Sequence, residues 1–287
     1  MENYAGLPPL INWEALRSLN MPVRREPPAP GPKEADNMWD KTSGMYSRMT
    51  ELEGKFTLDQ LDCIPIEPDD TVLDVCCGPG RTAVPAAKRA KLVTGIDSSK
   101  KMLEYCRRHA EEEGIRNLET RLIDWNEVIP GENLEQHDIA IACRCTAINE
   151  IEKLSACARK YAAIVIWANA PSIPEILSHL FEGAVEGRTF RPRPSDRRVG
   201  YNVFYNLVYD QGYDPNCKVL DDGYYAVYGS REAAYEDLKI LSDRPVTDEN
   251  RYHANVDRYL TENQYGTVTF LHKTRSLVLW WDTRVRN

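Results

Sequence analysis

The chain has 287 residues, of which 42% are apolar and 28% charged, and this ordinary composition excludes a disordered or fibrous protein. A formal net charge of -8 gives no net attraction to nucleic acid or anionic lipid. We therefore expect the partners to be small molecules or proteins and not nucleic acid. The N-terminus lacks the pattern of a secretory signal. The longest strongly apolar run, 161–170, is about half of the ~20 residues that a membrane helix needs. We therefore expect a cytoplasmic protein with no membrane segment.

The eight cysteines are expected to be reduced thiols, because a chain of this length without a secretory signal is not a disulfide scaffold. No CxxC pair occurs, and the five histidines do not lie at metal-ligand spacing from a cysteine. No metal site is expected.

The first twenty residues are predicted to form an arm, which offers a contact for a homo-oligomer. The segment 22–36 holds five prolines and alternating charges, as in an extended connector. Helical apolar spacing follows over 38–50 and 56–64.

From Thr71 onward, apolar strands alternate with amphipathic helices, which predicts a parallel sheet with crossover helices. The predicted strands are 71–75, 92–97, 117–124, 137–143 and 162–169, and the predicted helices are 82–90, 98–114 and 149–161.

Beyond residue 170 the pattern is less regular. Helices are predicted over 172–187, 199–212 and 231–241, and a short strand over 217–220. Two further strands, 266–271 and 276–283, are expected to be joined by a polar turn, HKTR.

The stretch VLDVCCGPGR, residues 72–81, runs from a strand into a turn that carries Gly78 and Gly80. Such a turn at a helix N-terminus is how an α/β sheet holds a nucleotide-like cofactor, and Asp97, at the end of the next strand, can accept from two ribose hydroxyls. GPGRTA also matches the glycine pattern for dinucleotides, so a nicotinamide cofactor remains open.

Two features favour a cationic adenosyl amino acid over a dinucleotide. Asp74, inside the first strand, would repel a pyrophosphate but can meet an ammonium group. Asp124 and Trp125 follow the third strand, where an acid can accept from an adenine amine and an aromatic ring can lie against the base.

On these motifs, residues 39–170 resemble the Rossmann-like (class I) S-adenosylmethionine-dependent methyltransferases. VLDVCCGPGR is similar to their first motif, hhDhGxGxG, and MWDKTSGMY, residues 38–46, to the aromatic segment that many members fold over the cofactor. The family's first glycine is Cys76 here, so the backbone must take a conformation that a Cβ tolerates, and cofactor affinity is expected to suffer. The resemblance places these residues at the cofactor: Asp74, Cys76, Gly78, Gly80, Asp97, Ser98, Asp124, Trp125, Cys143 and Tyr46.

The resemblance implies roles for five of them. Asp74 would contact the methionine amino end, the backbone around Gly78 and Gly80 would line the cofactor, Asp97 would hold the ribose and Asp124 would contact adenine. Cys76 and Cys77 could suggest redox chemistry, but small residues in a crowded turn are the favoured interpretation.

After the fourth strand, Cys143 and Cys145 could hold a soft metalloid substrate or fill the core. The chain lacks the Asn/Asp-Pro-Pro-aromatic motif of amino-methylating nucleic-acid enzymes, so adenine-N6 methylation is not expected.

Candidate catalytic groups are Cys145, Tyr205 and His179. Tyr205 belongs to a row of tyrosines that could shape a pocket or supply a hydroxyl, although packing is the commoner use, and His179 is a conceivable base on an apolar helix. Arginines from Arg188 to Arg198 could anchor a carboxylate or phosphate or form a solvated loop.

We expect one α/β domain, a Rossmann-like methyltransferase fold with a mostly parallel sheet of seven strands, the last antiparallel, and helices on both faces. Residues 1–60 would form the arm and a helical cap, 61–170 the cofactor-binding half, and 171–287 the substrate-selecting half of the same sheet. The expected reaction is methyl transfer from S-adenosylmethionine to a small molecule, with S-adenosylhomocysteine as product. An NAD(P)-dependent oxidoreductase and a non-catalytic S-adenosylmethionine-binding regulator remain as alternatives.

Overall fold

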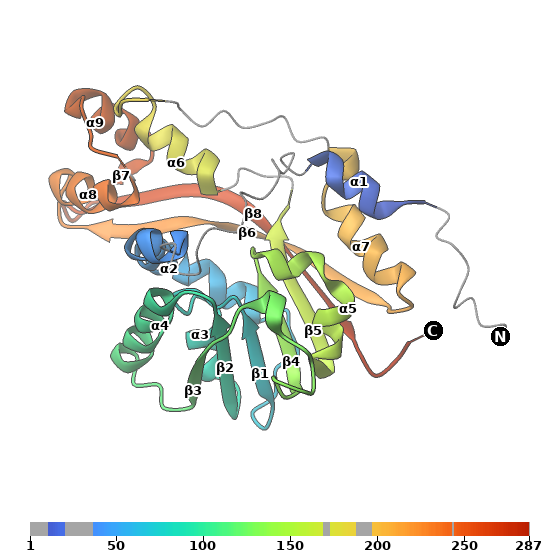
Figure 1. Ribbon diagram of the computed structural model, residues 1–287. Coiled ribbons are helices and arrows are strands. Elements are labelled where there is room, and N and C mark those ends of the chain that lie inside the picture. Colours follow the sequence, from blue (N-terminus) through green and yellow to red (C-terminus); the bar gives the residue numbers. More distant parts are fainter. Residues whose placement is uncertain (1–10, 21–36, 169–172, 188–196, 243, 287) are drawn as a thin grey trace.

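The structure, a computed structural model, describes residues 11–20, 37–168, 173–187, 197–242 and 244–286 (Figure 1). The proline-rich connector and most of the arginine-rich loop that the sequence singled out lie outside these ranges. The α-helices are α1 (Trp13–Asn20), α2 (Met38–Leu61), α3 (Ala83–Ala87), α4 (Lys100–Glu112), α5 (Ile151–Ala156), α6 (Ile173–Phe181), α7 (Tyr201–Asp210), α8 (Arg231–Leu238) and α9 (Glu249–Asp257). The strands are β1 (Thr71–Val75), β2 (Leu92–Asp97), β3 (Leu118–Leu122), β4 (His137–Cys143), β5 (Ala158–Trp167), β6 (Pro215–Tyr228), β7 (Leu260–Glu262) and β8 (Val268–Asp282).

One mixed sheet organises the fold, in the order β3, β2, β1, β4, β5, β8, β6, with β7 paired to β8. Strands β1 to β5 pair in parallel, whereas β8 is antiparallel to both of its long neighbours, β5 and β6. The predicted, mostly parallel sheet with a final antiparallel strand is confirmed, and β7 is a short addition to the seven strands in the main order.

Helices cover both faces of this sheet, which explains why β1, β4 and the end of β5 are apolar runs rather than alternating patterns. On one face Leu73, Ile164 and Trp281 pack with α5 and α7. On the other face Val72 and Ile141 pack with α3, α4 and the end of α2. The short helix α1, in the predicted arm, packs beside α7 of the same chain (Figure 1).

Four predicted elements differ from the structure. The predicted helices at 38–50 and 56–64 are one helix, α2, of 24 residues. The helix predicted over 149–161 ends at Ala156, because the next residues already pair in β5. The predicted strand at 217–220 is part of the 14-residue β6.

The polar turn predicted at HKTR was also wrong, since β8 runs through it without interruption. His272 and Thr274 are buried, whereas Lys273 and Arg275 are exposed. This alternation has the two-residue period of a strand, and β6 supplies the hydrogen-bonding partners along the whole segment.

Strands β6 and β8 continue well past the end of β5, whose pairing with β8 stops at Trp167 and Ser276. Helices α6, α8 and α9 pack on this extension, together with the first half of α2, in a second apolar core that includes Met49, Tyr224 and Phe270 (Figure 1). We call this unit the cap. Helix α2 therefore belongs to the cap core at its start and to the sheet core at its end.

Candidate functional site

The glycine turn after β1 has a left-handed backbone, including at the position occupied by the Cys76 side chain. Cys76 has φ of 54°, and Gly78 and Gly80 have φ of 54° and 89°. A left-handed residue with a Cβ costs about 1 to 2 kcal/mol, so Cys76 keeps the glycine conformation at a cost rather than avoiding it. At Gly80 a Cβ would lie 2.8 Å from the Cys106 Sγ, which requires glycine.

Asp97 ties this turn to the start of α4. Its Oδ2 accepts from the Gly78 N–H at 2.9 Å, and its Oδ1 accepts from the Ser99 N–H at 2.8 Å. Burial raises the pKa of Asp97, against the lowering effect of these N–H donors. Ser98, beside it, is exposed, and its carbonyl accepts from the Asn37 side chain at 3.0 Å.

The start of α2 is fastened across the carboxyl end of β2. Asp40 accepts from the Ser99 hydroxyl at 2.5 Å and from the Lys101 N–H at 3.2 Å. Tyr46, further along α2, is half-buried. Its ring lies edge-on to the ring of Trp39, with 5.5 Å between the ring centroids. The predicted N-terminal segment thus lies over the strand ends, while contact of Tyr46 with a cofactor stays a prediction.

Asp124 and Trp125 follow β3 as predicted, but they have different surroundings. Asp124 is partly exposed and caps a short 3-10 helix, Trp125–Glu127, by accepting from the Asn126 N–H at 2.9 Å. Trp125 is only 3% exposed, and its Nε1 donates to Glu150 at 3.0 Å. Trp125 therefore packs in the core, and Asp124 is the better placed of the two for an adenine amine.

Asp74 is buried at the end of β1, and its Oδ2 has no hydrogen-bonding partner among the described residues. Burial raises the pKa of Asp74 to about 7, although the Ala83 N–H and the Arg81 guanidinium oppose the rise. A buried carboxyl oxygen left without a donor beside the glycine turn fits an incoming ammonium group.

A buried network of charges, which the sequence analysis missed, lies beyond the ends of β1 and β4. Arg81, after the glycine turn, and Arg144, after β4, both donate to Glu53 of α2. Arg144 also donates to Asp222 of β6 and, at 2.7 Å, to the Ser276 hydroxyl of β8. The side chains of Arg144 and Asp222 are 6% and 1% exposed.

Two further contacts complete the network. Gln60 of α2 accepts from Arg81 at 2.8 Å and donates to Asp222 at 2.9 Å. The residues of this network come from α2, from two strand ends and from the β6–β8 pair. Because these elements are far apart in the sequence, no local motif predicts the network. The available signals were Arg81 and Arg144, charges directly beside buried runs.

The cysteines predicted near this site are engaged within the protein. The Cys143 Sγ accepts from Arg81 at 2.9 Å, and the Cys145 Sγ lies 3.5 Å from the Val75 carbonyl. A hydrogen bond with the Cys76 thiol, together with burial, raises the pKa of Cys145 well above its usual value, which keeps it protonated. In the described ranges no group of three or more His, Cys, Asp or Glu side chains could hold a metal ion.

The other two catalytic candidates lie elsewhere. Tyr205 is 38% exposed on α7, on the face of the sheet opposite α2. His179 lies in the cap, with its ring stacked on His272 at 5.7 Å. The structure brings neither to the glycine turn, because α7 and α6 pack on other parts of the long β6–β8 pair.

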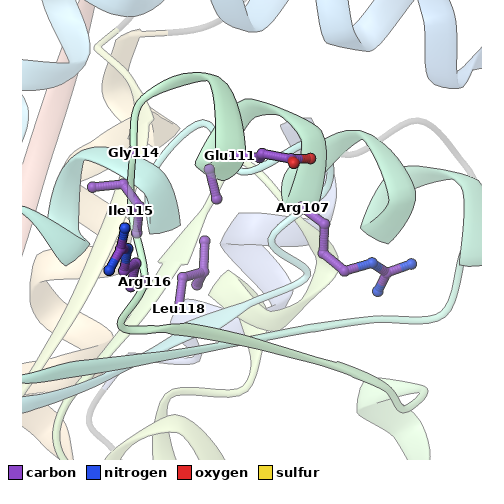
Figure 2. A pocket seen from close by; sticks show the side chains of 7 residues that line it. Arg107, Glu111, Gly114, Ile115, Arg116 and Leu118 are labelled. Atoms are coloured by element: carbon purple, nitrogen blue, oxygen red, sulfur yellow. The ribbon is translucent and has the colours of Figure 1, made fainter.

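A surface hollow lies at the β3 edge of the sheet, the edge opposite β6, where α4 leads into β3 (Figure 2). Arg107, Glu111 and Arg116 are among its lining residues. It is at the amino end of β3, whereas ligands of such sheets bind at the carboxyl ends. No residue of the candidate site contributes to it.

Comparison with known proteins identifies the family of this chain. Residues 72–165 match the family model for a methyltransferase domain. An uncharacterized protein of Haemophilus influenzae is 30% identical over 254 residues, which cover 85% of this chain and 88% of the relative. The chain belongs to the class I S-adenosylmethionine-dependent methyltransferases. S-adenosylmethionine is therefore its cofactor and methyl donor, and the nicotinamide and non-catalytic alternatives are set aside.

Other relatives of this methyltransferase match more locally or more distantly. The 23S rRNA (uracil(1939)-C(5))-methyltransferase RlmD of Alcanivorax borkumensis is 38% identical over 82 residues, which are 29% of this chain and 18% of RlmD. The magnesium protoporphyrin IX methyltransferase of Synechocystis, solved with S-adenosylhomocysteine, has a TM-score of 0.43 and 13% identity over 88% of this chain and 89% of its own. In the ranges that the structure describes, no helix is long and apolar enough to cross a membrane.

Proposed function

We propose that this methyltransferase acts on a small molecule, by in-line displacement of the methyl group from S-adenosylmethionine. The enclosure of the acceptor side supports this proposal. Beyond the ends of β4 and β5, α2 and the β6–β8 pair cover Arg144 and Asp222 almost completely. A base within a polymer would need an open approach at this point.

The residues at the glycine turn fit the cofactor. The unpartnered Asp74 Oδ2 would accept from the methionine ammonium, the turn at Gly78 and Gly80 would admit the cofactor close to the backbone, and Asp97 would hold the ribose. Asp124, which is partly exposed, would contact adenine. When bound, the cofactor supplies a methyl group already activated on a sulfonium.

The chain's own contribution is then to hold the acceptor in line with that methyl group and to exclude water, which can lower the barrier by roughly 7 to 11 kcal/mol. None of the three catalytic candidates offers a general base at the glycine turn, since the Cys145 thiol is held protonated and Tyr205 and His179 lie elsewhere. An acceptor that is already an anion would need none.

The local similarity to RlmD makes RNA the competing acceptor. The net charge of -8 disfavours it, because RNA binding draws most of its affinity from neutralised phosphates.

The test follows the methyl group from radiolabelled S-adenosylmethionine in a cell extract separated into small-molecule and RNA fractions. We expect label in the small-molecule fraction with the wild type and little with Asp97→Asn. An exposed variant, Glu51→Gln, serves as the control. Label appearing only in RNA would refute the small-molecule proposal while leaving the enzyme class intact.

A further inference from the structure

Three buried hydrogen-bond donors at the acceptor end of the site have no partner within the part of the chain that the structure describes. They are the Arg144 Nε, the Trp167 Nε1 and the Tyr224 hydroxyl. Buried polar groups are nearly always hydrogen-bonded, because an unmade bond leaves the cost of desolvation uncompensated. Arg144 and Tyr224 are 6% and 1% exposed, so bulk water does not satisfy these groups.

The three donors belong to residues grouped around the Arg144 guanidinium. The Arg144 guanidinium lies 4.8 Å over the Trp167 ring. Trp167 pairs in register with Ser276, whose hydroxyl accepts from Arg144. Tyr224 lies two residues after Asp222 in β6 and so projects from the same face, and Asp222 is bound to Arg144.

The chemistry of these groups selects their ligand. An arginine Nε and an indole Nε1 can only donate, and the arginine keeps its charge at any physiological pH. Burial raises the pKa of Tyr224 well above its usual value, so its hydroxyl remains a donor as well. The complementary group is an oxygen with several lone pairs, and an anionic oxygen makes the strongest bonds.

We propose that Arg144, Trp167 and Tyr224 bind a carboxylate of the methyl acceptor, which makes the substrate a small carboxylic acid. This inference rests on the proposed small-molecule function. The cofactor also carries a carboxylate on its methionine end, so the experiment has to distinguish the two sources.

The first measurement uses Tyr224→Phe, which removes only the unpartnered hydroxyl and keeps the ring in the core. Benzoate and its neutral counterpart benzamide are titrated into protein saturated with S-adenosylhomocysteine, by calorimetry. We expect benzoate to bind the wild type more tightly than benzamide does, and about tenfold more weakly to Tyr224→Phe than to the wild type. Tyr209→Phe, at an exposed tyrosine of α7, should bind benzoate as the wild type does.

Folding is monitored separately in the same variant. Removing a buried hydroxyl that has no partner should leave the urea midpoint unchanged or raise it, so weaker benzoate binding could not be ascribed to unfolding. Trp167→Phe provides a second, independent loss of a donor. Absence of benzoate binding, equal binding of benzamide, or unchanged benzoate affinity in both variants would overturn the proposal.

The second measurement locates the carboxylate. S-adenosylhomocysteine and 5′-methylthioadenosine, which lacks the amino-acid end, are titrated into wild type and Tyr224→Phe without benzoate. We expect no change for either ligand. Weaker binding of S-adenosylhomocysteine alone would assign the donors to the cofactor's carboxylate and overturn the proposal. Failure of the proposed function is distinguishable, since it would appear as label confined to RNA.

Discussion

The raised pKa of Asp74 makes the stability of the cofactor-free protein depend on pH. The pKa of this carboxyl rises from its usual 3.8 to about 7 because it is buried without a donor for Oδ2. Between these two values the folded chain holds a proton that the unfolded chain releases, so stability falls as the pH rises from about 4 to about 7. A tenfold change in proton affinity corresponds to about 1.4 kcal/mol, and the whole range therefore corresponds to roughly 4 kcal/mol.

Asp74→Asn removes the titration and keeps the shape of the side chain. The free energy of unfolding of both proteins is measured with urea at about pH 5 and about pH 8. From the lower to the higher pH, the wild type should lose roughly 3 kcal/mol of stability relative to the variant. This is less than the full value of roughly 4 kcal/mol because part of the loss of wild-type stability occurs below about pH 5. Subtracting the variant cancels the pH dependence of all other groups. The same difference in stability at both pH values would refute the assignment.

The same carboxyl should also control cofactor binding. An ammonium group at Asp74 requires the ionised carboxylate, so wild-type affinity for S-adenosylhomocysteine should fall as the pH drops below about 7. Asp74→Asn should bind more weakly and without this dependence. Binding of 5′-methylthioadenosine, which has no ammonium group, is the control, and an equal pH dependence for both ligands would contradict the role of Asp74.

Three further substitutions test the turn and the charge network by urea unfolding. Gly80→Ala should destabilise by roughly 1 to 3 kcal/mol more than Gly114→Ala, because both have positive φ but only the Gly80 Cβ would collide; equal losses would contradict this. Cys76→Gly should stabilise by roughly 1 kcal/mol through relief of the left-handed backbone, and a loss would show that its thiol contacts dominate. Glu53→Gln should cost roughly 3 to 5 kcal/mol, since it leaves buried arginines short of a carboxylate, whereas Glu51→Gln should cost almost nothing.

The cofactor half could be predicted from the sequence because its signals are local. Asp74, Gly78 and Gly80 lie within one strand and turn, and Asp97 ends the very next strand. The periodicities of the strands and helices around them agree with a parallel sheet, so pattern and motif supported each other.

The buried charge network could not be predicted, because its residues meet only through tertiary packing. Glu53, Arg144 and Asp222 are far apart in the chain and come together only when α2 crosses the strand ends and the β6–β8 pair completes the sheet. The HKTR segment, residues 272–275, is a second example. Its polar residues indicated a turn, but pairing with β6, which is distant in sequence, buries alternate side chains and makes the segment a strand.

Helix α2 is shared between the cap and the sheet, and this has a kinetic consequence. Under the proposed function, a substrate that approaches Arg144 past α2 displaces this helix, which separates Glu53 from Arg81 and Arg144. Opening is therefore expected to be slow compared with the chemical step, and turnover to be limited by release of product. Because salt screens buried charges poorly, the turnover rate should depend little on ionic strength.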